Sequence, residues 1–393
     1  MSHKLISRSP DLKRLRDEGF HVEIRGGFLL LRGVPYVTPQ KTVARGILVS
    51  TLKVVGERTA QPDTHVVEFA GEVPCDKEGR PLSKIINASK PRQIADGLTV
   101  KHIFSSKPKP SGKYQDYYEK MTTYLKILMS QAKAIDPNVD AATFPAYPAD
   151  ENDSVFKYAD TASSRAGISE AATRLQVDRV AIVGLGGTGS YVLDYISKTH
   201  VQEIHLYDGD DFCNHNAFRI PGAASLDELE EKLKKVDYLH RVYDKMRRGV
   251  VPHAEYVSES NLQDFVDMDF VFLCFDAGEA KAALVRTLEE ADVPFVDAGM
   301  GLYLSPTNTI HGMLRVTTSL PGKRDHVAKR VSVTAGGEDI YSKNIQLCEL
   351  NALNAALAVV RWKKYLAFYG DVENEHATVY ALDGNEMINE EKT

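Results

Sequence analysis

The sequence predicts an α/β protein of two domains: a Rossmann-like domain with a doubly wound, mainly parallel sheet, preceded by a smaller α+β domain. With 393 residues, the chain is longer than one hydrophobic core usually supports. Near residue 150 it becomes rich in proline, aspartate and asparagine, and the style of the two halves differs. We therefore expect an N-terminal accessory domain over residues 1–155 and a second domain over residues 156–393.

The first half carries strand and helix signals but no recognisable chemical motif. Residues 21–24 and 28–31 flank two glycines and predict a hairpin, and residues 65–73 predict another strand. Apolar residues recur at helical spacing over residues 114–133, which indicates an amphipathic helix. This half is therefore expected to mix helices and strands.

The second half alternates buried strands with helices. Residues 179–183 and 203–207 predict two strands joined by a glycine turn and a helix that ends at about residue 198. Further on, the pattern predicts strands at 270–275 and 294–296, a helix at 279–291 between them, an apolar core or dimer helix at 344–362, a strand at 378–382 and a disordered acidic tail from 389. A ligand is expected at the carboxyl ends of the parallel strands.

Composition and cysteine usage exclude several classes of protein. The net charge of -6 is spread without long single-sign runs, which argues against a dedicated nucleic-acid binder. No apolar run is long enough for a membrane span, and the first residues lack an apolar signal core, so a cytoplasmic protein is expected. The four cysteines form no C-x-x-C pair, which argues against a zinc site. Cys274 and Cys348 are best interpreted as small buried residues.

A glycine-rich turn follows the first strand of the second half. Gly184, Gly186, Gly187 and Gly189 open a helix, a context in which backbone N–H groups approach phosphates closely. Asp208 is the first acidic residue after the next strand, where a carboxylate typically accepts hydrogen bonds from ribose. These features alone fit an NAD-dependent oxidoreductase equally well.

A second group of polar residues makes the pattern specific. Asp208 and Asp210 are followed by Asn216 and Arg219, eight and eleven residues after the first aspartate, and Asp276 ends a later strand. Together with the glycines, this pattern resembles the ThiF/MoeB and ubiquitin-activating adenylyltransferase family. The resemblance covers about residues 160–365.

The resemblance implies an ATP and Mg²⁺ site. No zinc is expected, because the two C-x-x-C pairs that bind zinc in many relatives are missing from this chain. Gly187 and its neighbours would line the phosphates, Asp208 would hold the ribose with Asp210 beside it, Asn216 and Arg219 would contact the triphosphate, and Asp276 would carry Mg²⁺. The adenylation reaction needs such groups, because a carboxylate attacks the α-phosphorus and the growing negative charge must meet cations fixed beforehand.

Two further basic residues are implied by the resemblance. A lysine is expected on the helix after Arg219, for which Lys235 is the preferred match and Lys232 the competitor, with a solvated helix face as the alternative for either. Arg165 stands where the family has an arginine that enters the ATP site of a dimer partner. The resemblance thus implies a homodimer.

One departure from the family concerns the residue that accepts the acyl group. Many relatives have a catalytic cysteine in a Cys-x-x-Ala-Gly stretch of the loop that crosses the sheet, whereas this chain has Ser332 at that place. Either Ser332 accepts the activated carboxylate as an oxyester, or the enzyme stops at the acyl adenylate. Ser319 and Thr334 are alternatives to Ser332. The basic residues of this loop either meet an acidic partner or are solvated: Lys323, Arg324, Lys329 and Arg330.

The resemblance implies activation of the C-terminal carboxylate of a ubiquitin-like protein and its transfer to a ubiquitin-conjugating-like enzyme, in a bacterial ubiquitination-like pathway. The N-terminal domain would then dock one of these partners. Three alternatives remain: activation of a sulfur-carrier protein for cofactor biosynthesis, an NAD-dependent oxidoreductase, and a catalytically dead scaffold.

Overall fold

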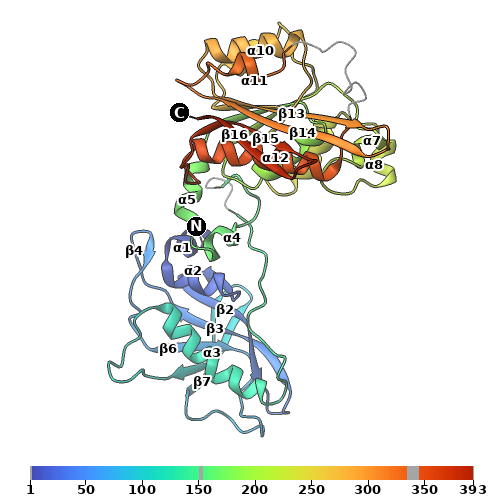
Figure 1. Cartoon of the computed structure of the whole chain (residues 1–393). Helices are drawn as coiled ribbons and strands as arrows, with labels where there is room; N and C mark the ends of the chain where they lie inside the picture. The colour runs from blue at the N-terminus through green and yellow to red at the C-terminus, as the bar shows by residue number, and fades with distance from the viewer. Residues whose placement is uncertain (1, 150–153, 334–344, 393) are drawn as a thin grey trace. The chain divides into compact units, whose positions relative to one another are not determined.

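The computed structural model describes residues 2–149, 154–333 and 345–392. The chain divides into two compact units, Met1–Asp153 and Ser154–Thr393 (Figure 1). None of the helices in the described ranges combines the length and apolar character that a membrane span requires.

The N-terminal unit is built on a six-stranded antiparallel sheet. Its strand order is β1-β2-β3-β6-β8-β7. The strands have these bounds: β1 His21–Arg25, β2 Phe28–Val37, β3 Val43–Thr51, β6 Val66–Ala70, β7 Ile86–Ala95 and β8 Leu98–Ser105. Val54–Val55 and Arg58–Thr59 form a separate small hairpin, β4 and β5. The hairpin and the strand predicted from the sequence for this unit are therefore confirmed.

Helices cover this sheet: α1 Ser2–Arg8, α2 Pro10–Asp17 and α3 Tyr117–Lys133. The α3 helix packs across β2 and β3, and Asp116 caps its first turn by accepting from the N–H of Glu119. Leu29 and Leu31 of β2 join Met121 and Leu125 of α3 in the main hydrophobic cluster. The alternation of the strand thus selects the face that the helix buries.

The C-terminal unit contains an eight-stranded sheet, in the order β11-β10-β9-β12-β13-β14-β15-β16. The first five strands in this order pair in parallel and the last three add antiparallel pairs. Their bounds are β9 Arg179–Val183, β10 Glu203–Tyr207, β11 Val250–His253, β12 Phe270–Leu273, β13 Phe295–Leu304, β14 Ile310–Ser319, β15 Glu375–Ala381 and β16 Glu386–Lys392.

Helices lie on both faces of this sheet, so the predicted doubly wound α/β fold is confirmed (Figure 1). Val180 and Ile182 of β9 pack in a cluster that includes residues of α6 and α12, whereas Ala181 and Val183 pack in another with residues of α10. The helices are α4 Thr161–Arg165, α5 Ser169–Ala172, α6 Gly187–Ile196, α7 Asn214–Ala217, α8 Leu226–Glu230, α9 Lys235–Asp244, α10 Glu279–Glu290, α11 Val327–Arg330 and α12 Cys348–Tyr365, with short 3-10 turns at Thr173–Leu175 and Leu262–Phe265.

The C-terminal residues form a strand, so the prediction of a disordered tail from residue 389 is wrong. Strand β16 pairs with β15 from Ala381↔Glu386 to Glu375↔Lys392. Arg330 pairs with Glu390 at 2.6 Å and with Glu391 at 2.9 Å. The backbone hydrogen bonds to the edge of β15 and the positive charge of Arg330 stabilise this strand despite its acidic residues.

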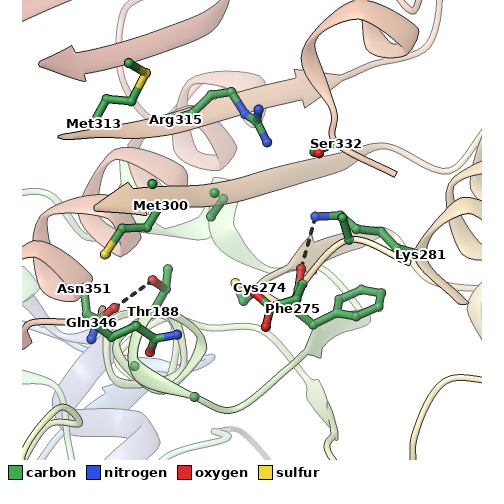
Figure 2. Close-up of a pocket in the computed structure, with 17 residues that line it drawn as sticks. Thr188, Cys274, Phe275, Lys281, Met300, Met313, Arg315, Ser332, Gln346 and Asn351 are labelled. Carbon is green, nitrogen blue, oxygen red and sulfur yellow. Dashed lines mark hydrogen bonds between the residues drawn. The ribbon is translucent and has the colours of Figure 1, made fainter. Parts of the chain in front are cut away.

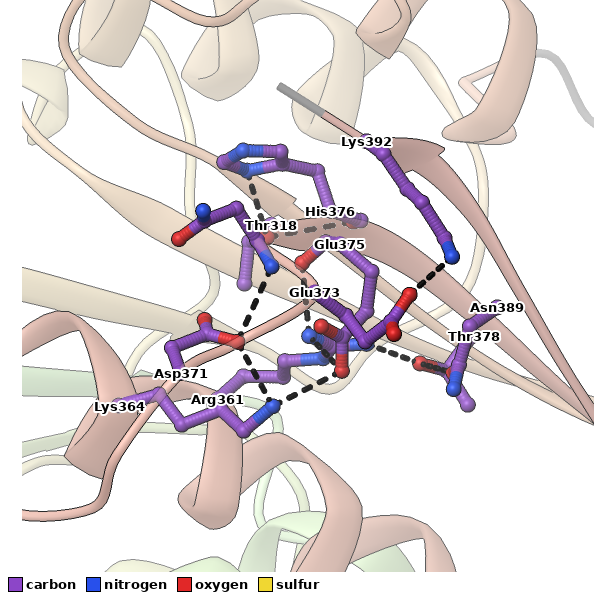
Figure 3. Close-up of polar contacts among 11 residues, drawn as sticks. Thr318, Arg361, Lys364, Asp371, Glu373, Glu375, His376, Thr378, Asn389 and Lys392 are labelled. Carbon is purple, nitrogen blue, oxygen red and sulfur yellow. Dashed lines mark hydrogen bonds and ion pairs between the residues drawn. The ribbon is translucent and has the colours of Figure 1, made fainter.

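A buried ion cluster fastens the end of α12 to β15 (Figure 3). Arg361 donates to the carbonyl of Glu375 at 2.7 Å and pairs with its carboxylate at 2.5 Å. Lys364 pairs with the same carboxylate at 2.9 Å and with Asp371 at 3.0 Å. The cluster holds α12 against the antiparallel part of the sheet.

Candidate functional site

The candidate site lies where the strand order of the sheet reverses. From β9 the chain runs outward through β10 and β11, and β12 then returns to the other side of β9. Ligands of doubly wound folds bind at such a point, beyond the carboxyl ends of the strands. Here a pocket of about 390 Å³ opens, lined by Gly186, Gly187, Thr188, Cys274, Phe275, Asp276, Ala277, Lys281, Ala298, Gly299, Met300, Gly301, Met313, Arg315, Ser332, Gln346 and Asn351 (Figure 2).

Three of the four predicted glycines are required by close packing. Gly184 has a φ of +86°, and a Cβ there would lie 2.6 Å from the carbonyl oxygen of Cys274. A Cβ at Gly189 would lie 1.9 Å from the carbonyl oxygen of Gly184. At Gly187, the first residue of α6, a Cβ would collide with the side chain of Asn351. The turn thus presents the start of α6 to the pocket without a side chain in between.

Asp208 orders this turn. Its Oδ2 accepts from the backbone N–H of Leu185 at 2.7 Å, and its Oδ1 accepts from that of Asp210 at 2.9 Å. The carboxylate is almost fully buried. Oδ1 can accept one further hydrogen bond, whereas Oδ2 already accepts a second one from Lys235 at 3.4 Å. The expected contact of Asp208 with ribose stays a prediction.

Lys235, rather than Lys232, lies among these acids. Its buried Nζ lies 2.5 Å from Asp210 Oδ2 and 3.4 Å from Asp208 Oδ2, whereas Lys232 is exposed. Hydrogen bonds from Lys235, and then from Tyr256, hold the pKa of Asp210 below its usual value. Lys235, in the first turn of α9, therefore favours the ionised form of Asp210.

Asn216 and Arg219 carry two orphaned donors. Asn216 Oδ1 accepts from the N–H of Cys213 at 2.8 Å, which fixes the carboxamide at the start of α7. The buried Nδ2 of Asn216 and Nε of Arg219 have no hydrogen-bond partner among the described residues. Buried donors are rarely left unpaired. Acceptor oxygens of a triphosphate would satisfy them, so the residues present fit ATP.

Asn351 of α12 joins two segments of the site and was not predicted. Its Oδ1 accepts from the Thr188 hydroxyl at 3.2 Å, and its Nδ2 donates to the carbonyl of Arg219 at 3.4 Å. The signal in the sequence is a carboxamide among the apolar residues of the predicted helix, a position shared by Asn354, which is also fully buried.

Asp276 and Ser332 line the same pocket from different segments. Asp276 follows β12 and is exposed. A magnesium ion usually takes one or two protein carboxylates together with substrate phosphates and water, so this position beside the glycine turn fits Mg²⁺. Ser332 follows α11, and its neighbours Val331 and Val333 pack into the hydrophobic core. Because extended backbone alternates its side chains, the serine faces away from that core.

The alternatives to Ser332 differ in exposure. Ser319 ends β14, is fully buried and accepts from Arg324 Nη1 at 2.7 Å, which leaves it unsuited to receive an acyl group. Thr334 lies outside the described residues. Cys274 lines the pocket, but burial raises the pKa of its thiol to about 12. It therefore stays protonated at neutral pH and is a poor nucleophile.

An ion triad, of which Lys281 and Arg315 line the pocket, was also missed by the sequence analysis. Asp297 of β13, fully buried, forms an ion pair with Lys281 and a contact of 3.3 Å with Arg315 Nη2. Lys281 also donates to the carbonyl of Phe275 at 3.1 Å (Figure 2). The triad thus fixes the backbone directly before Asp276.

Arg165 is a predicted site residue for which the structure gives no contact with the pocket. It ends α4 and is exposed, and it does not line the pocket. The predicted contribution of this arginine to the site of a dimer partner stays a prediction.

Comparison with known proteins identifies the family. Residues 158–382 match the model of the ThiF family, and residues 10–161 match a domain of unknown function, DUF6791. The chain belongs to the ThiF family, which confirms the resemblance predicted from the glycine and acidic motifs.

Individual relatives are distant. The chain is 26% identical over 220 residues to ubiquitin-like modifier-activating enzyme 5 of Drosophila mojavensis, covering 51% of this chain and 53% of the relative. It is 26% identical over 149 residues to tRNA threonylcarbamoyladenosine dehydratase of Escherichia coli K12, covering 35% and 53%. The chain thus spans about half the length of these curated relatives. A solved structure of E. coli MccB with ATP has a TM-score of 0.43 at 18% identity and covers 56% of this chain and 66% of that one.

Proposed function

We propose that this protein is an ATP- and Mg²⁺-dependent adenylyltransferase that activates the C-terminal carboxylate of a ubiquitin-like protein. The observation that carries the proposal is the convergence of the glycine turn, Asp276 and Ser332 on one pocket of about 390 Å³. The similarity to ubiquitin-like modifier-activating enzyme 5 supports the class of substrate.

In the first step, an oxygen of the substrate carboxylate bonds to the α-phosphorus, the bond from that phosphorus to the bridging oxygen breaks, and pyrophosphate leaves. The N–H groups at the start of α6, with Asn216 and Arg219, hold the triphosphate in place. Asp276 would hold Mg²⁺, which neutralises phosphate charge when bound. Asp208, ordered by Lys235, orients the nucleoside.

In the second step, Ser332 Oγ bonds to the acyl carbon, the acyl–phosphate bond breaks and AMP leaves, which produces an oxyester. In this step the proton of the hydroxyl passes to solvent, and the reactive adenylate supplies the driving force. Direct transfer from the adenylate to a ubiquitin-conjugating-like enzyme is the alternative route. In this scheme the enzyme is a cytoplasmic homodimer in which the partner's Arg165 completes each ATP site, and residues 1–155 dock the protein partners.

Intact-mass spectrometry tests this proposal. Wild type and Ser332→Ala are incubated with MgATP and a ubiquitin-like protein encoded beside this one. We expect wild type to gain the mass of the partner minus water, in a bond that resists thiols and is cleaved by mild base, and the variant to gain nothing. AMP and pyrophosphate without an adduct in either protein would instead favour direct transfer. Absence of nucleotide turnover would contradict adenylation.

The similarity to the tRNA threonylcarbamoyladenosine dehydratase favours a second candidate, activation of a carboxylate on RNA. The same assay with total tRNA in place of the protein distinguishes the two. AMP release that requires RNA and not the ubiquitin-like protein would favour this second candidate.

A further inference from the structure

Two basic side chains line the pocket, and they differ in burial and in how many of their N–H groups have a partner among the described residues. Lys281 has an exposed fraction of 3% and is engaged by Asp297 and by the carbonyl of Phe275. The side chain of Arg315 is 31% exposed and touches Asp297 through Nη2 alone, at 3.3 Å. Its buried Nε has no partner among the described residues. Most of the five guanidinium N–H groups are therefore available to a ligand.

The strand opposite Arg315 is shaped to receive this guanidinium. Gly299 of β13 is the direct cross-strand partner of Arg315. A Cβ at residue 299 would lie 2.9 Å from Arg315 Nη2. The guanidinium therefore lies over bare backbone, and Asp297, two residues earlier on the same face, fixes its inner edge. Such an arginine is preorganised before any ligand arrives.

The charges of this triad leave one positive charge facing the pocket. Asp297 carries one negative charge, and Lys281 and Arg315 carry two positive charges between them. Lys281 is the more deeply buried of the two cations, with 3% of its side chain exposed against 31% for Arg315, so Arg315 is the cation that a ligand in the pocket can reach. Figure 2 shows both side chains beside the pocket. A planar guanidinium with free N–H groups matches a carboxylate in a bidentate geometry. The triphosphate, by contrast, is assigned to the glycine turn, Asn216 and Arg219.

We infer that Arg315 binds the terminal carboxylate of the substrate and orients it for attack on the α-phosphorus. This inference rests on the proposed function and adds to it a specificity residue. The guanidinium binds both carboxylate oxygens before the reaction and keeps one of them while the other attacks. The interaction weakens once the acyl adenylate has lost that charge. Arg315 therefore selects a free carboxylate over an amide.

The test uses the full-length protein and a synthetic peptide that ends in Gly-Gly, made with a free carboxylate and as the C-terminal amide. Affinities are measured by calorimetry with a non-hydrolysable ATP analogue and Mg²⁺, and activity by ATP–pyrophosphate exchange. A charge-assisted pair predicts that wild type prefers the acid by about 10- to 100-fold. Arg315→Met should bind acid and amide equally, with affinity for the ATP analogue within about twofold of wild type.

Two further variants keep the test independent of folding. Arg286→Met is the matched control, because Arg286 is an exposed arginine of α10 that does not line the pocket; it should behave as wild type. Gly299→Ala retains the arginine but displaces its guanidinium, and it should lose the same preference. Arg315→Met leaves Asp297 paired with Lys281, so the variant should fold, which a thermal unfolding curve checks.

The outcomes separate the inference from the proposed function. An acid preference retained in Arg315→Met overturns the inference alone, as does weakened binding of the ATP analogue with peptide binding unchanged. If wild type binds the ATP analogue but neither exchanges pyrophosphate nor prefers the acid, the proposed function itself is overturned.

Discussion

Single residues of the pocket divide into those that shape the backbone and those that face a ligand. Gly184 and Gly189 serve the first role, since a side chain at either would collide with backbone. Asp276 belongs to the second, because it is exposed and lines the pocket. Substitutions of the glycines should therefore destabilise the fold, whereas substitutions of ligand-facing residues should reduce activity and leave the fold intact.

Asp276→Ala should abolish pyrophosphate release while leaving the fold intact. Loss of a carboxylate that positions Mg²⁺ should lower ATP–pyrophosphate exchange at least about 100-fold, which corresponds to roughly 2.7 kcal/mol of transition-state stabilisation. Asp227→Ala, at an exposed aspartate of α8 outside the pocket, is the control. Full exchange activity in Asp276→Ala would contradict the assignment of this residue.

Lys120 should make the stability of the N-terminal unit depend on pH. It is fully buried, its Nζ donates to Ser50 Oγ at 2.8 Å, and burial lowers its pKa to about 8 from an ordinary value of 10.5. Between these two values the unfolded chain binds more protons, so the free energy of unfolding rises as the pH rises above 8. Relative to Lys120→Met, wild type should gain about 2 kcal/mol between pH 7 and pH 9.5.

Urea unfolding of both proteins at the two pH values measures this gain. Lys126→Met, at an exposed lysine of the same helix, is the matched control and should titrate as wild type does. An equal pH dependence in wild type and Lys120→Met would show that Lys120 is charged and solvated in the folded protein.

At the scale of elements, strand β16 anchors the segment that carries Ser332. Arg330 is the last residue of α11, and it is shared between Glu390 and Glu391 of β16. Ser332 follows two residues later. These ion pairs are partly exposed and contribute little to global stability. Their effect is instead to fix the position of α11 relative to the pocket.

Replacement of both acids, Glu390→Gln with Glu391→Gln, should therefore slow formation of the Ser332 oxyester without changing adenylation. A nucleophile that is held less precisely reacts more slowly, so we expect the rate of oxyester formation to fall about 10-fold or more. Single-turnover formation of the adduct, followed by intact mass, is compared with pyrophosphate exchange. Glu386→Gln changes an exposed acid of the same strand and is the control. An equal loss of both activities would indicate general destabilisation instead.

The elements and the site differed in how far the sequence could predict them. The glycine turn, Asp208 and Asp276 follow directly after strands, so local pattern places them. Asn351 and Arg315 contribute through contacts with segments distant in sequence, such as the bond from Thr188 to Asn351, and no local pattern reveals such contacts. Strand β16 was missed because its pairing with β15 and Arg330 outweighs its low intrinsic strand propensity.

At the scale of the whole molecule, the hydrophobic clusters indicate two cooperative units. Each cluster formed by the described residues is drawn from one unit alone: those around Phe69 and around Leu30 belong to Met1–Asp153, and those around Trp362 and around Phe295 belong to Ser154–Thr393. A unit with its own core can unfold on its own.

The chain should therefore unfold in two thermal transitions that respond to different perturbations. A non-hydrolysable ATP analogue with Mg²⁺, at about 100 times its Kd, adds about 2.7 kcal/mol to the unit that binds it, which raises the midpoint of that transition by about 5–10 °C. Phe69→Ala removes a fully buried side chain of the unit Met1–Asp153. It should lower the free energy of unfolding of that unit by about 3–5 kcal/mol and leave the nucleotide-sensitive transition unchanged. Arg361→Met removes one of the cations that pair with the buried carboxylate of Glu375 (Figure 3). It should lower the free energy of unfolding of the nucleotide-binding unit alone, by about 3 kcal/mol. Calorimetry of wild type, wild type with the ATP analogue, Phe69→Ala and Arg361→Met tests this prediction. A single transition that moves with every perturbation would show that the two units unfold together.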